Sequence, residues 1–115
     1  MDHTGKRVII LVETLYNEFE FWYPYYRLKE AGVEVVVVGT GSADEYQSKS
    51  GLACRPDKVV DQVSHEDFDG LIIPGGYAPD HMRRYPAMVK LVRDMSNAGK
   101  LIGAICYAGW MLASA

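Results

Sequence analysis

One cysteine in this 115-residue sequence stands where an enzyme would place a nucleophile. Cys106 follows an apolar run at residues 101–105 and precedes a segment, from Tyr107 onward, that is typical of a helix. The small residues Ala104 and Ala108 flank it and allow a sharp strand-to-helix turn. The dipole of a helix N-terminus favours the thiolate form of a thiol. The pattern therefore predicts a nucleophile elbow at Cys106, and the alternative is a small buried side chain, as free cysteines often are.

A Pro-Gly-Gly turn at residues 74–76 follows another apolar run. Sites in open α/β sheets form beyond the carboxyl ends of the strands, which is also the edge predicted for Cys106. Backbone N–H groups of Gly75 and Gly76, with that of Tyr107, would form an oxyanion hole at this edge. A plain strand-ending turn is the alternative.

The first predicted helix opens with Asn17 and carries Glu20 three residues later. This spacing is typical of a capping box, in which Glu20 would bind the backbone N–H of Asn17. Alternatively, Glu20 reaches Cys106 and donates a hydrogen bond to its sulfur from a protonated carboxyl. The spacing alone favours the cap. Cys54 has no comparable setting, and we interpret it as structural.

Apolar runs of strand length alternate with helical segments along the chain. The runs are continuous rather than alternating, which is typical of strands buried on both faces of a parallel sheet. They span residues 8–12, 33–38, 71–73 and 101–105, and helices are predicted at 18–31 and 86–98. This order predicts an α/β fold with three layers. Residues 50–54 and 58–60 are predicted as short strands at the edge of the sheet, and residues 64–67 as a brief capped helical turn.

The composition indicates one globular domain and excludes several classes of protein. Hydrophobic residues make up 49% of the chain, which excludes a disordered tail. A net charge of -3 gives no reason to expect nucleic acid or an anionic membrane as a partner. No apolar run is long enough to span a bilayer. We expect no cofactor and no metal, because the two cysteines lack metal-binding spacing and the Gly-Thr-Gly at residues 39–41 lacks the rest of a dinucleotide fingerprint. The expected location is cytoplasmic, with both thiols reduced.

Together these pieces resemble the PfpI/ThiJ superfamily, glutamine-amidotransferase-like proteins that include intracellular protease I and the parkinsonism-associated protein deglycase. The resemblance covers nearly the whole chain and is carried by residues 20–24, 27–32, 73–80 and 104–106. It implies a flavodoxin-like α/β/α sandwich with a mostly parallel sheet, truncated at the C-terminus. Residues 1–115 would then be the N-terminal two thirds of a single domain. The resemblance also implies a homo-oligomer, either a dimer or a hexamer, and part of the aromatic cluster at residues 16–26 is a candidate interface.

By this resemblance, Cys106 matches the reactive cysteine of the family and Glu20 matches the acid that hydrogen-bonds its sulfur, which reverses the preference for the cap. Gly75 and Gly76 match the oxyanion-hole turn. Asp80 matches an acid that, in the protease-like branch, comes from a neighbouring subunit and orients a histidine beside the cysteine.

Tyr107 departs from that branch, where the residue after the nucleophile is usually histidine. A phenol is a poor base at neutral pH, although it can donate a hydrogen bond. His81 is a possible substitute base, and a solvated loop histidine is the alternative.

We therefore expect a cysteine-dependent enzyme that acts on a small carbonyl or amide substrate, as a glyoxalase or deglycase does, or under the label of a protease or amidase. Peptide hydrolysis is the less favoured chemistry, because no good general acid for the leaving amine is evident. The alternative function is a thiol redox sensor or stress-response protein.

Overall fold

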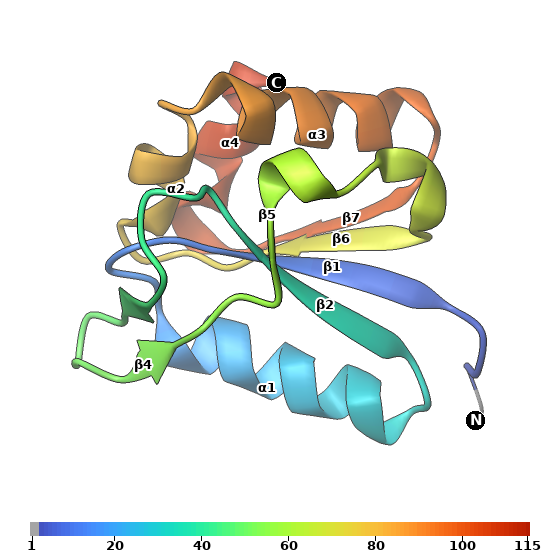
Figure 1. The fold of residues 1–115 in the computed structure, drawn as a ribbon, viewed down its shortest axis with the longest axis horizontal. Helices are drawn as coiled ribbons and strands as arrows, with labels where there is room; N and C mark the ends of the chain where they lie inside the picture. Colours follow the sequence, from blue (N-terminus) through green and yellow to red (C-terminus); the bar gives the residue numbers. More distant parts are fainter. Residues whose placement is uncertain (1–2) are drawn as a thin grey trace.

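The apolar runs form the centre of a parallel sheet in the computed structural model, which describes residues 3–115 (Figure 1). The sheet has five strands in the order β5-β2-β1-β6-β7, and every neighbouring pair is parallel. The strands are β1 (Arg7–Val12), β2 (Glu34–Gly39), β5 (Lys58–Val59), β6 (Gly70–Ile73) and β7 (Leu101–Ala104). The fold predicted from the alternating runs is confirmed.

Helices cover both faces of the sheet. In Figure 1, α1 (Glu18–Glu30) lies on one face, and α3 (Pro86–Asn97) and α4 (Gly109–Ser114) lie on the other. The short helix α2 (Ala78–Met82) lies beside the end of β6. Helix α3 buries the side chains at i, i+3, i+4 and i+7, which are Met88, Leu91, Val92 and Met95. This is the apolar stripe of a helix that packs on a core.

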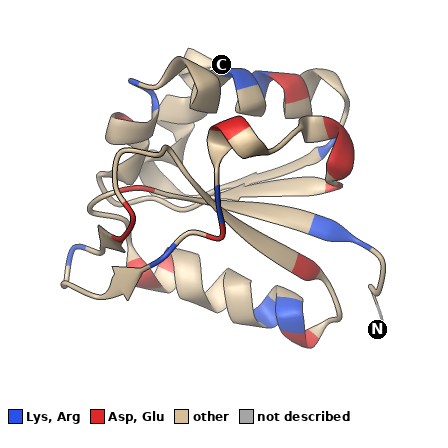
Figure 2. Cartoon of the chain, viewed as in Figure 1, with Lys and Arg blue, Asp and Glu red and all other residues tan. Residues whose placement is uncertain are grey.

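The core lies between these layers and explains why the strand runs are continuous. The last four residues of β1 are fully buried, because a central parallel strand is covered on both faces. In Figure 2 the middle parts of the long strands carry no charged residue, and charged residues lie on the outer helices, the loops and the strand ends. No helix within residues 3–115 is both long enough and apolar enough to cross a bilayer.

The prediction for residues 50–54 is wrong. These residues do not join the main sheet, since β4 (Ala53–Cys54) pairs with β3 (Tyr46–Gln47) in a separate antiparallel hairpin. The turn between them contains Gly51 at a φ of 90°, and Ser48 bonds both sides of it through its backbone N–H and its hydroxyl. The backbone N–H and C=O groups of β4 are therefore paired within a local hairpin instead of at the edge of the main sheet.

The other two short elements were predicted correctly. Strand β5 pairs with β2 at the edge of the main sheet and leads into the 3-10 helix η1 (Val60–Gln62). The brief helical turn is the 3-10 helix η2 (His65–Asp67), where the Ser64 hydroxyl accepts a hydrogen bond from the N–H of Glu66.

Candidate active site

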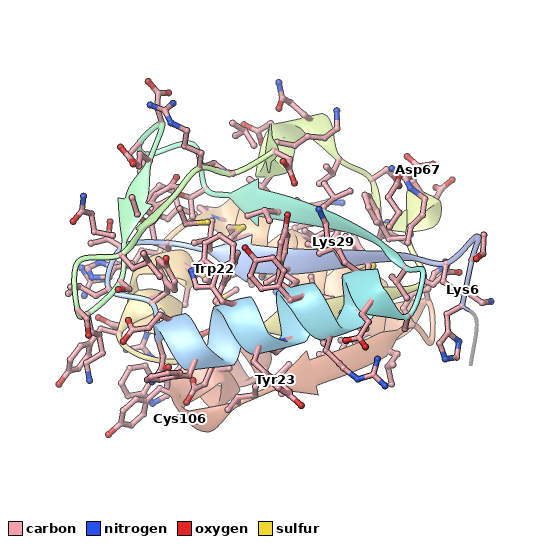
Figure 3. All side chains as sticks on the ribbon, turned by 90° about the horizontal axis from the view of Figure 1, so that it is seen from below. Lys6, Trp22, Tyr23, Lys29, Asp67 and Cys106 are labelled. Atoms are coloured by element: carbon pink, nitrogen blue, oxygen red, sulfur yellow. The ribbon has the colours of Figure 1, made fainter. Side chains whose placement is uncertain are left out.

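Three loops meet at one end of the sheet because the strands before them are neighbours. Strand β6 lies between β1 and β7. The loop after β1 leads to Glu20 in α1, the turn after β6 contains Gly75, and β7 leads to Cys106. Parallel strands present their carboxyl ends at the same edge, so topology alone places Gly75 between the other two residues. Figure 3 shows Cys106 at the end of the sheet where α1 begins, opposite Lys6.

Cys106 adopts a left-handed backbone conformation, with a φ of 56°. Such a conformation is uncommon for a residue with a side chain and stores strain. Cys106 also begins the 3-10 helix η3 (Cys106–Ala108), and its side chain is exposed. The positive φ and the short helix that follows agree with the predicted sharp turn, and the exposure of Cys106 in this chain favours the elbow over a buried structural cysteine. Its role as a nucleophile stays a prediction.

Gly75 is required at its position because a side chain would have no room. A Cβ atom there would lie 2.9 Å from the Cβ of Cys106 and 2.9 Å from the carbonyl oxygen of Ile105. The backbone N–H of Gly75 donates to Oε1 of Glu20 at 2.8 Å, so it is not free to bind an oxyanion. Glu20 thus occupies this donor in the present arrangement, and the assignment of Gly75 to an oxyanion hole stays a prediction. Within residues 3–115 the N–H groups of Gly76 and Tyr107 make no backbone or side-chain hydrogen bond, and these two donors stay candidates.

The start of α1 separates the two interpretations of Glu20. Asn17 caps the helix, since its Oδ1 accepts from the N–H of Phe19 at 3.0 Å and of Glu20 at 3.2 Å. The reciprocal half of the capping box is absent, because the N–H of Asn17 donates to the carbonyl of Gly75. The carboxyl of Glu20 points to Gly75 instead. It makes no hydrogen bond to the sulfur of Cys106 among residues 3–115, so its contact with Cys106 runs through Gly75.

The loop between β1 and α1 is held as an extra strand segment, a feature that the sequence analysis missed. Leu15 has a φ of 65°, its N–H donates to Gln47, and its carbonyl accepts from Tyr77. Tyr16 forms bridges to Ser48 on one side and Gly76 on the other. Leu15 and Cys106 are not glycines, yet both have a positive φ. Both follow strands at the same edge of the sheet, so backbone strain is concentrated there.

Glu13 is a second missed residue. It follows β1 directly and is only 3% exposed. Its carboxylate accepts hydrogen bonds from the hydroxyls of Thr40 and Ser42 and from the N–H of Thr14. These bonds tie the loop after β1 to the loop after β2. Glu13 could have been identified from the sequence because it directly follows a predicted strand, which is the same signal that identified Cys106.

Asp80 and His81 form no hydrogen bond or ion pair with Cys106 among residues 3–115, so their roles at the site stay predictions. Asp80 lies in α2 and forms ion pairs with Arg83 at 2.6 Å and Arg84 at 2.8 Å. The hydrogen bond from Arg83, reinforced by the charges of Arg84 and His81, lowers the pKa of Asp80. Neither Asp80 nor His81 makes a hydrogen bond or ion pair with Cys106 within residues 3–115. The described residues of one chain therefore show no hydrogen-bonded acid–histidine–cysteine relay.

Cys54 lies in a contrasting environment. It is 2% exposed, and desolvation raises the pKa of its thiol to about 12. The interpretation of Cys54 as a structural residue agrees with this burial. Of the aromatic cluster, Tyr16 and Phe21 are core residues, whereas Phe19, Tyr23 and Tyr26 are exposed. The predicted interface at those exposed rings stays a prediction.

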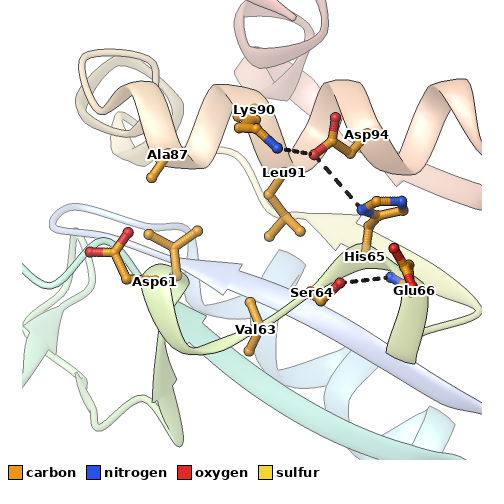
Figure 4. A pocket seen from close by; sticks show the side chains of 10 residues that line it. Asp61, Val63, Ser64, His65, Glu66, Ala87, Lys90, Leu91 and Asp94 are labelled. Atoms are coloured by element: carbon orange, nitrogen blue, oxygen red, sulfur yellow. Dashed lines mark hydrogen bonds and ion pairs between the residues drawn. The ribbon is translucent and has the colours of Figure 1, made fainter.

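A separate cavity of about 400 Å³ lies between η1, η2 and α3 (Figure 4). Asp94 projects into it and pairs with Lys90 at 2.6 Å and with His65 at 3.8 Å. The hydrogen bond from Lys90 lowers the pKa of Asp94. No cysteine lines this cavity, so it does not suit the predicted chemistry. Nowhere in residues 3–115 do three His, Cys, Asp or Glu side chains gather closely enough to hold a metal ion.

Comparison with known proteins assigns this architecture to a family. A model of the DJ-1/PfpI family matches residues 6–115, so the chain belongs to the DJ-1/PfpI family. An uncharacterized protein of Archaeoglobus fulgidus is 40% identical over 109 residues, which is 95% of this chain and 64% of that protein. A deglycase of Pyrococcus horikoshii is 35% identical over 109 residues, which is 95% of this chain and 65% of the deglycase. The chain thus spans just under two thirds of the length of these relatives.

A solved structure confirms the fold class. A two-domain protein of Anabaena variabilis contains DJ-1/ThiJ/PfpI-like and ferritin-like domains. It matches with a TM-score of 0.92 and 39% identity, over 96% of this chain and 32% of that protein. The predicted family and the flavodoxin-like α/β/α sandwich are therefore both confirmed.

Proposed function

We propose that this protein is a cysteine-dependent enzyme that converts small α-oxoaldehydes, or releases them from their adducts, as the name deglycase of its relative suggests. The observation that carries this proposal is the backbone of Cys106. Cys106 has a left-handed backbone at the end of a strand, an exposed side chain, and a neighbouring glycine that leaves room for it. These features are typical of a nucleophile elbow. Strain of this kind clusters at functional sites.

The first step is the addition of the Cys106 thiolate to the aldehyde carbon. A carbon–sulfur bond forms, and the π electrons of the C=O bond move to the oxygen. The N–H groups of Gly76 and Tyr107 stabilise that oxygen while it carries negative charge. Protonation of the oxygen completes a hemithioacetal. The hydrogen bond from Gly75 holds the carboxyl of Glu20 at the space that a Gly75 side chain would fill, and Cys106 borders the same space. We assign to this carboxyl the transfer of protons to and from the adduct.

The remaining chemistry needs no external oxidant. A proton moves from the former aldehyde carbon to the adjacent carbonyl carbon by way of Glu20, while the hydroxyl proton of the adduct passes to the second oxygen, which gives a 2-hydroxy thioester. Water then adds to the thioester carbon, the carbon–sulfur bond breaks, and the 2-hydroxy acid leaves as the Cys106 thiolate is restored. The aldehyde carbon is oxidised and its neighbour is reduced, so electrons balance within the substrate. A peptidase would need a strong general acid for the leaving amine, and the phenol of Tyr107 does not supply one.

Methylglyoxal consumption and lactate formation test the proposal directly. We expect Cys106→Ser to abolish lactate formation and Glu20→Gln to reduce it by about a hundredfold or more, the usual size of a lost acid–base group. Cys54→Ala is the matched control, because it removes the other thiol far from the chemistry, and it should retain activity in proportion to its folded fraction. Lactate formation by Cys106→Ser at the wild-type rate would refute the proposal.

The alternative is a redox sensor, which the exposure of Cys106 favours. A thiolate beside a carboxyl is oxidised by peroxide to a sulfinic acid, with two oxygen atoms added to the sulfur. Intact mass after peroxide treatment, measured beside the lactate assay, separates the two functions. Oxidation of Cys106 without any methylglyoxal turnover would support the sensor and contradict the enzyme.

A further inference from the structure

Three aromatic rings, two of them exposed and the third half-buried, form a row that begins next to Cys106. We call them the aromatic ledge: Tyr77, Tyr107 and Trp110. The rings of Tyr107 and Trp110 stack with centroids 4.7 Å apart and an interplanar angle of 22°. The rings of Tyr77 and Tyr107 are nearly parallel at 11°, but their centroids are 6.4 Å apart. Both tyrosines leave about half of their surface exposed, 51% for Tyr77 and 49% for Tyr107.

The sheet register explains why the ledge borders the elbow. Ile73 of β6 pairs with Ala104 of β7, so the two chains leave the sheet side by side. Gly75 then lies against Cys106, and the next residues on each chain lead to Tyr77 and Tyr107. Neither tyrosine ring belongs to the core, because both are about half exposed.

Cations lie against the two outer rings of the ledge. The ammonium of Lys49 lies 5.3 Å from the centroid of Tyr77, and the guanidinium of Arg83 lies 5.1 Å from that of Trp110. Arg83 is itself held by Asp80. Contacts of this kind attract a cation to the face of a ring and restrict the ring's motion. The cations cover part of the two outer rings and hold them in place, while Tyr77 and Tyr107 keep exposed ring surface. A planar group that stacks on this surface meets rings that are already ordered, so binding costs little side-chain entropy.

We infer that the aromatic ledge binds the ring of an aromatic carbonyl compound and holds its reactive carbon at Cys106. The substrate class is then the aryl α-oxoaldehydes, which carry a planar ring next to the dicarbonyl group. This inference rests on the proposed function for turnover, but binding and attack at Cys106 are tested without it. The covalent step is the one given above: a carbon–sulfur bond forms, the C=O electrons move to oxygen, and Glu20 supplies the proton.

Irreversible alkylation provides the test, because it needs no turnover. The probes are 2-bromoacetophenone and bromoacetone, in which the thiolate displaces bromide from the same kind of carbon beside an aryl or a methyl ketone. Each rate at Cys106, followed by mass spectrometry, is divided by the rate with N-acetylcysteine. We expect the aryl probe to be favoured threefold to tenfold, the size of one aromatic stacking contact.

Variants of Tyr77 test whether the preference for the aryl probe depends on the aromatic ledge. We expect Tyr77→Leu to remove most of the preference and Tyr77→Phe to keep it, which shows that a ring rather than folding is responsible. Tyr26→Leu is the matched control, since Tyr26 is an exposed aromatic residue on α1, and it should leave the ratio unchanged. A ratio near one in the wild type would overturn the inference, and so would a preference that persists in Tyr77→Leu.

Turnover separates the failure of this inference from the failure of the proposed function. If methylglyoxal is consumed but the alkylation ratio is near one, the enzyme stands and the ledge assignment falls. If the ratio depends on Tyr77 but neither methylglyoxal nor phenylglyoxal is converted to its hydroxy acid, the ledge binds aromatic carbonyl groups and the proposed function falls. If both hold, kcat/KM for phenylglyoxal should exceed that for methylglyoxal by a similar factor.

Discussion

The two cysteines of this chain occupy opposite environments. Cys106 lies on a strained turn at the carboxyl end of β7 with its side chain exposed, whereas Cys54 lies in the relaxed β3–β4 hairpin and is buried. Burial disfavours a charged thiolate and raises the pKa of Cys54 to about 12. The same side chain is therefore reactive or inert according to its position in the fold. The difference teaches that backbone strain and exposure, not residue type, mark the candidate site.

The largest expected effect is the difference in reactivity between these two thiols. At pH 8 a thiol with a pKa of about 12 has roughly a thousandth of the thiolate of an unperturbed cysteine, and burial slows reagents further. We expect iodoacetamide to alkylate Cys106 at least about a hundredfold faster than Cys54. Peptide mass spectrometry over a time course measures both rates. The two should converge in denaturant, and equal rates in the native protein would contradict the comparison.

Replacing Gly75 should disrupt the strained region directly. A Cβ atom at this position would approach Cys106 and Ile105 at 2.9 Å, and overpacking of this kind destabilises by about 1–3 kcal/mol. We therefore expect Gly75→Ala to lower the urea midpoint and to slow alkylation of Cys106. The matched control is Gly109→Ala, where no atom lies within 4 Å and the backbone is helical. It should be neutral or stabilising by up to about 1 kcal/mol. An unchanged midpoint for Gly75→Ala would show that the turn tolerates a side chain.

Variants of Glu13 test whether the hydrogen bonds between the loops after β1 and β2 stabilise the protein. Glu13→Ala removes the buried carboxylate that accepts from the hydroxyls of Thr40 and Ser42, and the loss of these bonds costs about 1–3 kcal/mol. Glu13→Gln keeps an acceptor oxygen and should lose less. Urea denaturation of both variants measures the loss. Equal stability of Glu13→Ala and the wild type would show that the buried carboxylate is not structural.

Asn17 tests the cap separately from the chemistry. Asn17→Ala should lose about 1 kcal/mol, because the N–H groups of Phe19 and Glu20 lose their acceptor. Asn17→Asp should restore most of it. If Asn17→Ala leaves the urea midpoint unchanged, the cap does not contribute to stability.

The smallest expected effect concerns Asp80, whose pKa is lowered by Arg83 and Arg84. A lowered folded-state pKa gives stability that is present above the unfolded value, near 3.8, and is lost as pH falls through the folded value. We expect Asp80→Asn to have a slightly lower Tm than the wild type at pH 7, because exposed ion pairs contribute little. The gap should close below about pH 3.8. A gap that widens in acid would contradict this assignment.

Much of the fold and part of the site followed from local pattern. Continuous apolar runs predict buried parallel strands, and a cysteine between such a run and a helix predicts an elbow. What local pattern did not settle was the choice of partner. The carboxyl of Glu20 bonds to Gly75, 55 residues away, rather than to its own helix start or to the sulfur of Cys106. Residues 53–54 pair with a nearby strand instead of joining the sheet edge. Patterns of residue type do not specify which of several available partners a polar group will choose.

The sequence by itself determined the family, the parallel sheet and the position of Cys106 at a strand end, because these depend on periodicity and on residues adjacent in the chain. Only the tertiary structure decided that β6 lies between β1 and β7. That order brings Gly75 between Glu20 and Cys106 and places Tyr77 beside Tyr107. The reason is physical: strand order is set by how distant apolar faces pack together, and no local spacing encodes it.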